Sequence, residues 1–137
     1  MRVPQRGENN LSSNLAAKTK VKDESLADLI VDSIQDIKGK NIMKLDLRKL
    51  DYAPASCFII CEGESSTQVK AIAQNINRRV KEEMQLSANH TEGIMDSKWI
   101  LVDFFDIIVH VFYPETRSFY DLENLWSDAD ISTYEDV

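Results

Sequence analysis

Cysteine, glycine and proline are all scarce in this chain of 137 residues, which contains two, four and three of them. The cysteines, Cys57 and Cys61, share an apolar run, so in a strand their α-carbons would lie roughly 13 Å apart. A disulfide tolerates at most about 7 Å. The two histidines, His90 and His110, stand at a spacing that fits no common zinc site. We therefore expect free thiols packed as small apolar groups and no bound metal.

The sequence also has no long apolar run. No stretch approaches the roughly 18–20 residues that a membrane-spanning helix needs, and residues 1–22 contain no apolar core of the signal-peptide kind. With 43% hydrophobic and 28% charged residues, the composition is that of a globular protein of one domain. These features predict a cytoplasmic protein without a membrane segment.

Basic residues are outnumbered, at 16 against 23 acidic residues, and the net charge is −7. Binding to the phosphates of naked nucleic acid needs clustered lysine and arginine, so the charge argues against naked nucleic acid as the main partner. The charge is also uneven, because residues 1–22 carry five bases and one acid, whereas residues 118–137 carry six acids and no base. The acidic end is more typical of charge that simply keeps a protein soluble, although it would also suit a basic protein partner.

The chain divides into three parts by pattern. Residues 1–24 are polar without a sustained apolar period and are assigned to a mobile leader. Residues 25–126 contain every periodic segment and form the predicted domain. Residues 127–137 are polar and acidic, which indicates a C-terminal tail.

Two amphipathic helices are predicted within the domain. The first begins near Ser25, whose hydroxyl offers a cap, and ends before Gly39. The second begins at Ser65, which forms a capping-box pattern with Gln68, and continues with one apolar face to Met84.

The strands follow from short apolar or alternating runs. They are predicted at residues 42–47, 56–61, 99–104 and 107–112, with a further extended piece at 119–122 and a helical turn at 124–126. Only two residues separate the third and fourth strands, which is typical of a hairpin. The order predicts an α/β (α+β) fold, a single mixed sheet of about five strands with two main helices on one face.

One face of the predicted hairpin carries unusual side chains. Alternation places Trp99 and Asp103 on one face of their strand, and His110 and Phe112 on one face of the next. If the register brings these sets together, the face is either a core with hydrogen-bonded polar groups or an interface that mixes aromatic anchors with polar groups. The pattern alone supports both interpretations equally.

Each candidate catalytic group in the sequence lacks the other residues that its chemistry needs. Gly63 lies between a strand and a helix, where phosphate-binding turns occur, but neither G-x-G-x-x-G nor G-x-x-x-x-G-K-[ST] is present. Asp46 has no second carboxylate beside it, whereas nucleotidyl transfer needs paired carboxylates for metal ions. His110 lies within an apolar strand, and no G-x-S-x-G motif occurs. We therefore expect a protein that is not an enzyme.

Four motifs resemble the signature of the ribosomal silencing factor family, also called Iojap-like. Residues 65–73 resemble its S-x-x-Q-x-x-A-I-A helix start, and residues 99–103 its W-x-L-x-D pattern. Residues 108–112 resemble V-V-H-x-F, and residues 117–126 follow R-x-x-Y-x-L-E-x-L-W. The resemblance covers roughly residues 26–126, which is nearly the whole predicted domain.

The resemblance implies a nucleotidyltransferase-like fold without catalytic carboxylates, cofactor or metal. It also implies a function, which is to bind ribosomal protein L-fourteen of the large ribosomal subunit. Bound there, such a factor sterically blocks association of the large and small subunits and represses translation. Members of the family can form homodimers, so self-association could coexist with this function. The alternative to the repressor function is a metal-dependent, nucleotidyltransferase-like enzyme.

Residues carried over from the resemblance form a predicted partner-binding set. Aromatic members would act as desolvated anchors and carboxylates as partners for lysine or arginine. The set comprises Trp99, Asp103, His110, Phe112, Tyr120, Asp121, Leu122, Glu123 and Trp126. Asp103 and His110 have a second interpretation, as an internal polar pair that fixes the sheet.

Overall fold

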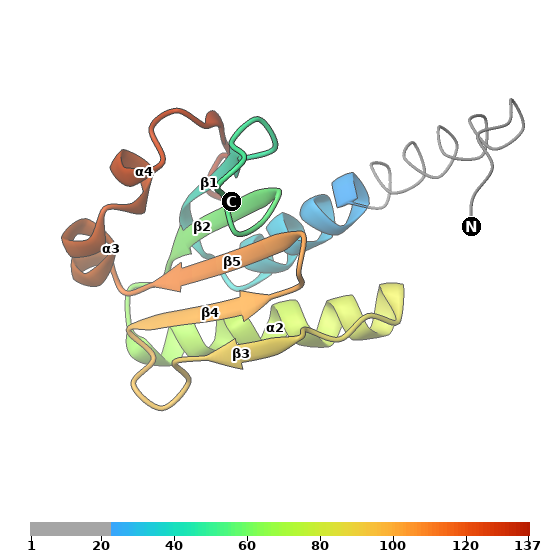
Figure 1. The fold of residues 1–137 in the computed structure, drawn as a ribbon. Helices are drawn as coiled ribbons and strands as arrows, with labels where there is room; N and C mark the ends of the chain where they lie inside the picture. The colour runs from blue at the N-terminus through green and yellow to red at the C-terminus, as the bar shows by residue number, and fades with distance from the viewer. Residues whose placement is uncertain (1–22) are drawn as a thin grey trace, which may run out of the picture.

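The structure, a computed structural model, describes residues 23–137 (Figure 1). The predicted leader thus lies outside the described residues except for 23 and 24, which are helical. The described part of the first helix covers residues 23–36. The elements that follow are β1 (Lys40–Asp46), β2 (Cys57–Glu62), α2 (Ser66–Met84), β3 (His90–Glu92), β4 (Trp99–Asp103), β5 (Ile107–Phe112), α3 (Pro114–Tyr120), α4 (Leu122–Leu125) and β6 (Asp130–Thr133).

The strands form one six-stranded mixed sheet in the order β3-β4-β5-β2-β1-β6. Only β2 and β5 run parallel, and the other neighbours are antiparallel. The predicted fold class is therefore confirmed, with one strand more than the expected five. No helix within the described residues is long and apolar enough to cross a membrane.

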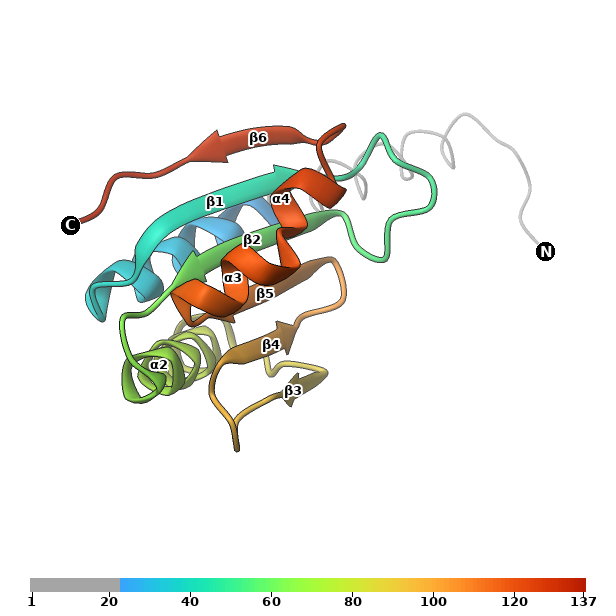
Figure 2. The same cartoon turned by 90° about the vertical axis from the view of Figure 1, so that its left-hand side faces the viewer.

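The first helix and α2 lie together on one face of the sheet, as Figures 1 and 2 show. Their apolar sides meet the inward side chains of β2, β4 and β5 in the larger hydrophobic core. Ile34 and Ile72 are fully buried there. Periodic apolar residues form these helices because each buries one stripe against the sheet.

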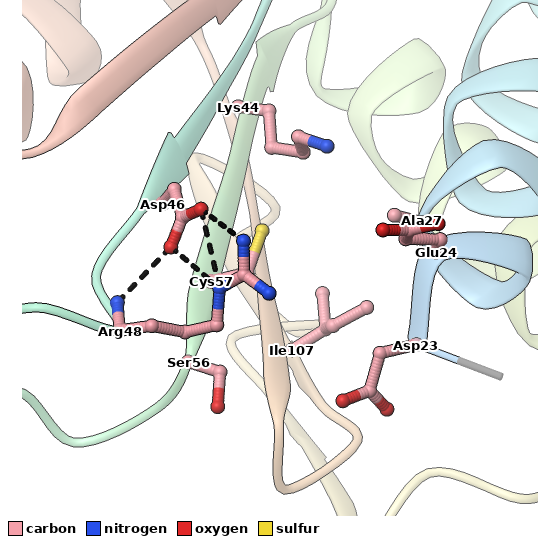
Figure 3. A pocket seen from close by; sticks show the side chains of 9 residues that line it. All are labelled: Asp23, Glu24, Ala27, Lys44, Asp46, Arg48, Ser56, Cys57 and Ile107. Atoms are coloured by element: carbon pink, nitrogen blue, oxygen red, sulfur yellow. Dashed lines mark hydrogen bonds and ion pairs between the residues drawn. The ribbon is translucent and has the colours of Figure 1, made fainter. Parts of the chain in front are cut away.

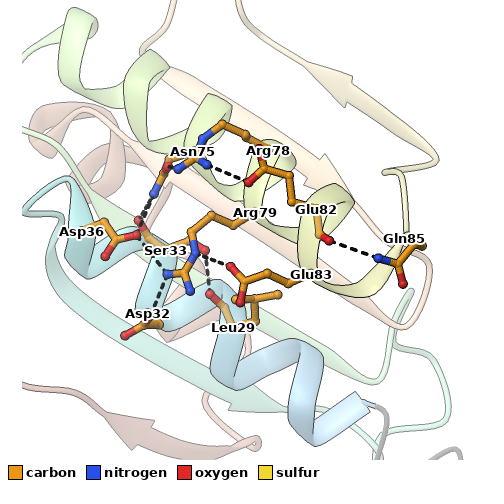
Figure 4. A network of polar contacts seen from close by, with 10 residues as sticks. All are labelled: Leu29, Asp32, Ser33, Asp36, Asn75, Arg78, Arg79, Glu82, Glu83 and Gln85. Carbon is orange, nitrogen blue, oxygen red and sulfur yellow. Dashed lines mark hydrogen bonds and ion pairs between the residues drawn. The ribbon is translucent and has the colours of Figure 1, made fainter.

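Polar contacts between the first helix and α2 surround Arg79 (Figure 4). Its guanidinium lies 2.6 Å from Asp32, 2.9 Å from Asp36 and 2.7 Å from Glu83. The hydrogen bonds to these carboxylates raise the pKa of Arg79, and the bond to Glu83 has the largest effect. Asn75 also donates from Nδ2 to the backbone oxygen of Ser33 at 2.8 Å. The two helices are thus joined by charge as well as by apolar packing.

The predicted cap of α2 is confirmed, whereas that of the first helix is wrong. The backbone N–H of Gln68 donates to Ser65 Oγ at 3.1 Å, and the Gln68 side chain donates to the backbone oxygen of Ile37 at 2.9 Å. This second bond holds the start of α2 against the end of the first helix. Ser25 caps nothing, because residues 23 and 24 are already helical.

Two predictions for the C-terminal region need correction. Residues 119–122 are not an extended piece: they comprise the end of α3, the left-handed residue Asp121 and the start of α4. Pro114 occupies the first turn of α3, where its fixed φ favours a helix. Within residues 127–137, assigned to a tail, β6 pairs with β1, with Leu45 opposite Ile131. All four β6 residues are exposed, so this strand lacks the apolar alternation that marks a half-buried one.

The expectation of helices on only one face is also wrong. Figure 2 shows α3 and α4 in front of the sheet, opposite the first helix and α2. A second, smaller hydrophobic core lies beneath them. It consists of Leu45, Leu47, Phe58, Ile60, Phe112 and Leu122. The face that the sequence analysis left open is therefore partly covered by the chain itself.

Candidate functional site

The side chains that the sequence analysis singled out lie on the second face of the sheet. In the β4–β5 pair, Trp99 stands opposite Phe112 and Asp103 opposite Ile108. Leu101 stands opposite His110. Because alternate residues of a strand share a face, this register confirms that the two predicted sets meet on one face.

Trp99 is the centre of an aromatic cluster at one end of that face. Its ring stacks on Phe112 with centroids 5.0 Å apart, and it packs against Tyr120 of α3 at 4.6 Å. Its indole Nε1 donates a hydrogen bond of 3.1 Å to His110 Nδ1. This half-buried tryptophan therefore connects the sheet to α3.

His110 is an interior group, with only 4% of its surface exposed. Burial lowers the pKa of His110 to about 4, so the imidazole is neutral at pH 7. Since Nδ1 accepts from Trp99, the single ring proton lies on Nε2. That nitrogen is buried without a hydrogen-bond partner among the described residues, and the ring edge packs on Phe58 with centroids 4.6 Å apart.

Asp103 and His110 do not form the internal pair that was one interpretation. Asp103 Oδ1 accepts from the backbone N–H of Phe105 at 2.7 Å, and its Oδ2 lies 3.8 Å from Nδ1 of His90 on β3. His110 instead contacts Trp99. A diagonal position across β4 and β5 separates the two groups, because Asp103 is level with Ile108.

Three of the nine predicted contact residues are buried. Phe112 and Leu122, at 0% and 9% exposed, belong to the second core, and His110, at 4%, packs against Phe58 and Trp99. Their side chains therefore shape the surface from beneath and are not available to a partner. Asp103 is separate from the aromatic cluster, at the other end of β4.

Tyr120, Asp121 and Glu123 lie where α3 meets α4. Asp121 adopts a left-handed backbone with φ 47°, ending α3 and preceding α4, a conformation that aspartate tolerates better than most residues. Tyr120 is 49% exposed, and Asp121 is exposed beside it. Glu123 is less free, because its Oε1 accepts from Arg117 Nε at 2.8 Å.

Arg117 is a positioning residue that the predicted set did not include. Its side chain is 11% exposed, and Nη1 lies 2.6 Å from the backbone oxygen of Asn41 and 3.2 Å from Glu62 Oε1. Together with the bond to Glu123, these contacts tie α3 and α4 to the start of β1 and the end of β2. The arginine of the R-x-x-Y pattern was the available signal for this role.

Trp126 closes the other end of the second core. Its ring stacks on Tyr52 with centroids 5.5 Å apart and meets Phe58 edge-on at 5.7 Å. Trp126 is therefore half-buried, and it contributes both to the core and to the surface.

Three large side chains are more exposed than any predicted anchor: Phe119 at 80%, Tyr52 at 71% and Leu125 at 70%. We call the surface formed by Tyr120, Asp121, Phe119 and Leu125 the α3–α4 face.

A shallow open groove borders the α3–α4 face. It lies between α3 and the connection from β3 to β4. Its lining includes Trp99, Phe119 and Tyr120 as well as the charged side chains of Asp96, Lys98 and Glu115. Exposed rings with charges at their edge are typical of a protein interface rather than of a reaction centre.

Asp46 lies by a small pocket between the first helix and β1–β2, whose lining also includes Asp23 and Glu24 (Figure 3). Arg48 lies 2.6 Å from Asp46, and this hydrogen bond lowers the pKa of Asp46. Burial raises the pKa of the nearby Cys57 thiol to about 12, which leaves it protonated at pH 7. Both cysteines are free thiols, as predicted. Across residues 23–137, no group of three or more histidine, cysteine, aspartate or glutamate side chains is arranged to hold a metal ion.

Comparison with known proteins decides the family. The model of one family, described as "Ribosomal silencing factor during starvation", matches residues 20–137. The chain belongs to this family. The matched range includes β6 as well as the four motifs that carried the resemblance.

Several relatives in this family match about three quarters of this chain. A ribosomal silencing factor of Halalkalibacterium halodurans is 35% identical over 106 residues, which cover 77% of this chain and 89% of that protein. One from Chromobacterium violaceum is 38% identical over 106 residues, covering 75% and 83%. The chloroplastic protein Iojap of Zea mays is 33% identical over 105 residues, covering 77% of this chain and 45% of that protein.

Solved structures show the same fold. A crystal structure of a Chromobacterium violaceum protein matches with a TM-score of 0.72 and 36% identity, covering 76% of this chain and 85% of that one. A Bacillus halodurans protein matches with a TM-score of 0.67 and 32% identity, covering 82% and 98%. The names of the ribosomal silencing factor relatives describe a regulator and indicate no catalytic activity.

Proposed function

We propose that this protein acts in the cytoplasm as a non-catalytic repressor of translation that docks on the large ribosomal subunit through its α3–α4 face. Its partner there is ribosomal protein L-fourteen. Once bound, the protein occupies space that the small subunit needs, so the two subunits do not associate. Membership of the ribosomal silencing factor family supports ribosome association.

The exposure of Phe119 and Leu125 beside Asp121 is the observation that carries this proposal. Large apolar side chains at 80% and 70% exposure are unfavourable in water unless a partner covers them. Aromatic anchors with carboxylates at their edge suit a partner surface that has apolar pockets and basic side chains. The net charge of −7 favours a basic protein over the phosphates of ribosomal RNA.

The test is a sucrose-gradient profile of isolated ribosomal subunits with and without the purified protein. We expect the protein to migrate with the large subunit and to reduce the amount of joined ribosomes. The Phe119→Ala variant should stay nearer the top of the gradient and restore joining, whereas the control Lys70→Ala, on exposed α2 surface, should behave as wild type. Unaltered joining at saturating wild-type protein would refute the repressor function.

The identity of the partner needs a separate test. Purified ribosomal protein L-fourteen should bind the wild-type chain in calorimetry and should bind Phe119→Ala less tightly. Self-association through the same rings would compete with this contact, because one surface cannot be covered twice. Sedimentation velocity over a concentration series measures it, and a dimer that hides Phe119 would exclude simultaneous docking.

A further inference from the structure

The outer edge of the sheet at β6 presents backbone groups that β1 does not use. The N–H of Tyr134 donates to the backbone oxygen of Ile42 at 3.1 Å, and Ser132 stands opposite Lys44. In an antiparallel pair, successive residues direct their N–H and C=O groups alternately toward and away from the neighbour. The backbone groups of Ile131 and Thr133 therefore point away from β1.

β6 carries few of the features that protect a sheet edge, since its one charged residue is Asp130 and it is one residue longer than β3. Natural sheets discourage further pairing with lysine, proline, a bulge or a very short edge strand. The opposite edge strand, β3, has only three residues and is protected by its shortness. β6 has neither lysine nor proline, its four residues are all exposed, and Figure 2 shows no element beyond it within residues 23–137.

The surroundings of this edge are acidic. Exposed carboxylates precede, occupy and follow the strand, at Asp128, Asp130, Glu135 and Asp136, and residues 127–137 contain no basic residue. Lys49 lies 3.5 Å from Asp130, but both side chains are largely exposed, so this pair offsets little of the charge. An approaching strand therefore meets an excess of negative charge at both ends of β6.

We infer that β6 is a docking edge for an extended, lysine- or arginine-bearing segment of another protein, which adds to the sheet as a seventh strand. The outward groups of Ile131 and Thr133 supply main-chain hydrogen bonds, and the flanking carboxylates select basic side chains. A second copy of this chain fits poorly, because pairing β6 with β6 brings the same carboxylates together. The inference goes beyond the proposed function, since it does not use the α3–α4 face.

The experiment uses the full chain labelled with ¹⁵N and a capped nine-residue peptide of alternating lysine and valine as the probe. We expect the peptide to slow hydrogen exchange at the amides of Ile131 and Thr133, which exchange quickly in the free protein. A matched peptide of alternating glutamate and valine should not bind. Binding of the lysine peptide should weaken as salt is raised, because exposed charges are screened beyond about 10 Å at 0.1 M.

Two substitutions at one position separate strand addition from general charge attraction. Ile131→Pro removes only an outward N–H, so pairing with β1 is retained, and proline is tolerated at such edge positions. We expect it to weaken the lysine peptide about tenfold through the lost bond and the blocked approach. The control Ile131→Ala keeps the N–H and should bind within about twofold of wild type.

Several outcomes would overturn the inference. Equal binding by Ile131→Pro and wild type would show that the edge backbone is not used, and equal binding of the glutamate peptide would show that charge does not select the partner. Protection of the Ile131 amide in the free protein would show that a second copy or another segment already occupies the edge. If Ile131→Pro fails to fold, the double variant Asp128→Asn with Glu135→Gln replaces it. That variant should bind the lysine peptide several-fold less tightly, and unchanged affinity would refute the inference.

Discussion

The two faces of the sheet are closed by different kinds of contact. The first helix and α2 close one face with aliphatic side chains such as Ile34 and Ile72, which are fully buried. α3 and α4 close the other face with aromatic rings around Trp99 and with the ion pairs of Arg117. Large rings remain exposed on the second side, at Phe119 and Tyr120.

This difference separates stability from recognition. Aliphatic burial over a continuous helix face stabilises the fold and leaves little apolar surface for a partner. The short α3–α4 segment buries few side chains, so its position depends on a small number of specific contacts, and it presents its rings to solvent. Substitutions on the first face should therefore change folding, and substitutions on the second should change binding more than folding.

Ile72→Ala should have the largest effect on stability. It removes a fully buried side chain from α2 and leaves a cavity against the first helix, for which about 3–4 kcal/mol of unfolding free energy is expected. Urea unfolding followed by circular dichroism measures the change, and Lys70→Ala on the exposed side of α2 is the control. A loss below about 1 kcal/mol would mean that this core repacks and that the contrast between faces is overstated.

Acid should weaken the second face through His110. The pKa of His110 is lowered by burial from 6.5 to about 4, so below pH 6.5 the unfolded chain takes up a proton that the folded protein does not. The contribution of His110 to the unfolding free energy is therefore fully present above pH 6.5. It falls by about 3 kcal/mol as the pH drops toward 4. Urea unfolding at several pH values should give a shallower decline for His110→Leu, and equal slopes would contradict the buried neutral imidazole.

Arg117→Gln should loosen α3 and α4 from the sheet. The substitution leaves Glu62 and Glu123 without their shared cation in a partly buried site, which should cost about 2 kcal/mol. Lys49→Gln breaks an exposed pair with Asp130 and should cost less than about 0.5 kcal/mol. The tryptophan fluorescence of the Arg117→Gln variant should shift at lower urea than its global unfolding. A loss of stability no larger than that of Lys49→Gln would show that the Arg117 contacts do not stabilise α3 and α4.

Phe119→Ala should weaken binding without lowering stability, which is the opposite of what a core variant such as Ile72→Ala should do. The ring is 80% exposed, so the unfolding free energy should change by less than about 0.5 kcal/mol. Binding to the large subunit should weaken by about 2 kcal/mol, or roughly 30-fold, as for a truncated anchor residue. Sedimentation with isolated large subunits measures the affinity. Loss of stability without loss of binding would place Phe119 in the fold and not in the interface.

Local patterns predicted the first face well. The Ser65 and Gln68 cap depends on residues three positions apart, and the continuous apolar strand at residues 56–61 is covered on both faces as expected. The strand-face alternation also placed Trp99 beside Phe112 correctly. These features follow from sequence because the interactions that form them are close along the chain or repeat with a fixed period.

The second face depends on contacts between distant segments, which periodicity does not encode. β6 has an exposed, polar sequence, and it is a strand only because β1, some 85 residues earlier, supplies its hydrogen-bond partners. The sequence motif included Arg117, but it could not predict the contact of Arg117 with the backbone of Asn41. The burial of Leu122 in the second core likewise follows from the placement of α4, which no local pattern specified.

Asp121→Asn should have the smallest effect and tests whether charge on the α3–α4 face guides docking. Asparagine keeps the left-handed backbone at this position, so the fold should be unchanged while one negative charge is lost. Rim charges act mainly on the association rate, so we expect a several-fold slower association with large subunits, a free-energy change of about 0.5–1 kcal/mol, and little change in dissociation. Asp106→Asn, in the exposed turn between β4 and β5, removes the same charge elsewhere and should bind as wild type at 0.1 M salt. If both variants slow association equally, the net charge of the molecule steers it. If only Asp121→Asn does, the carboxylate beside Tyr120 meets a basic group on the partner, and the second face is where recognition occurs.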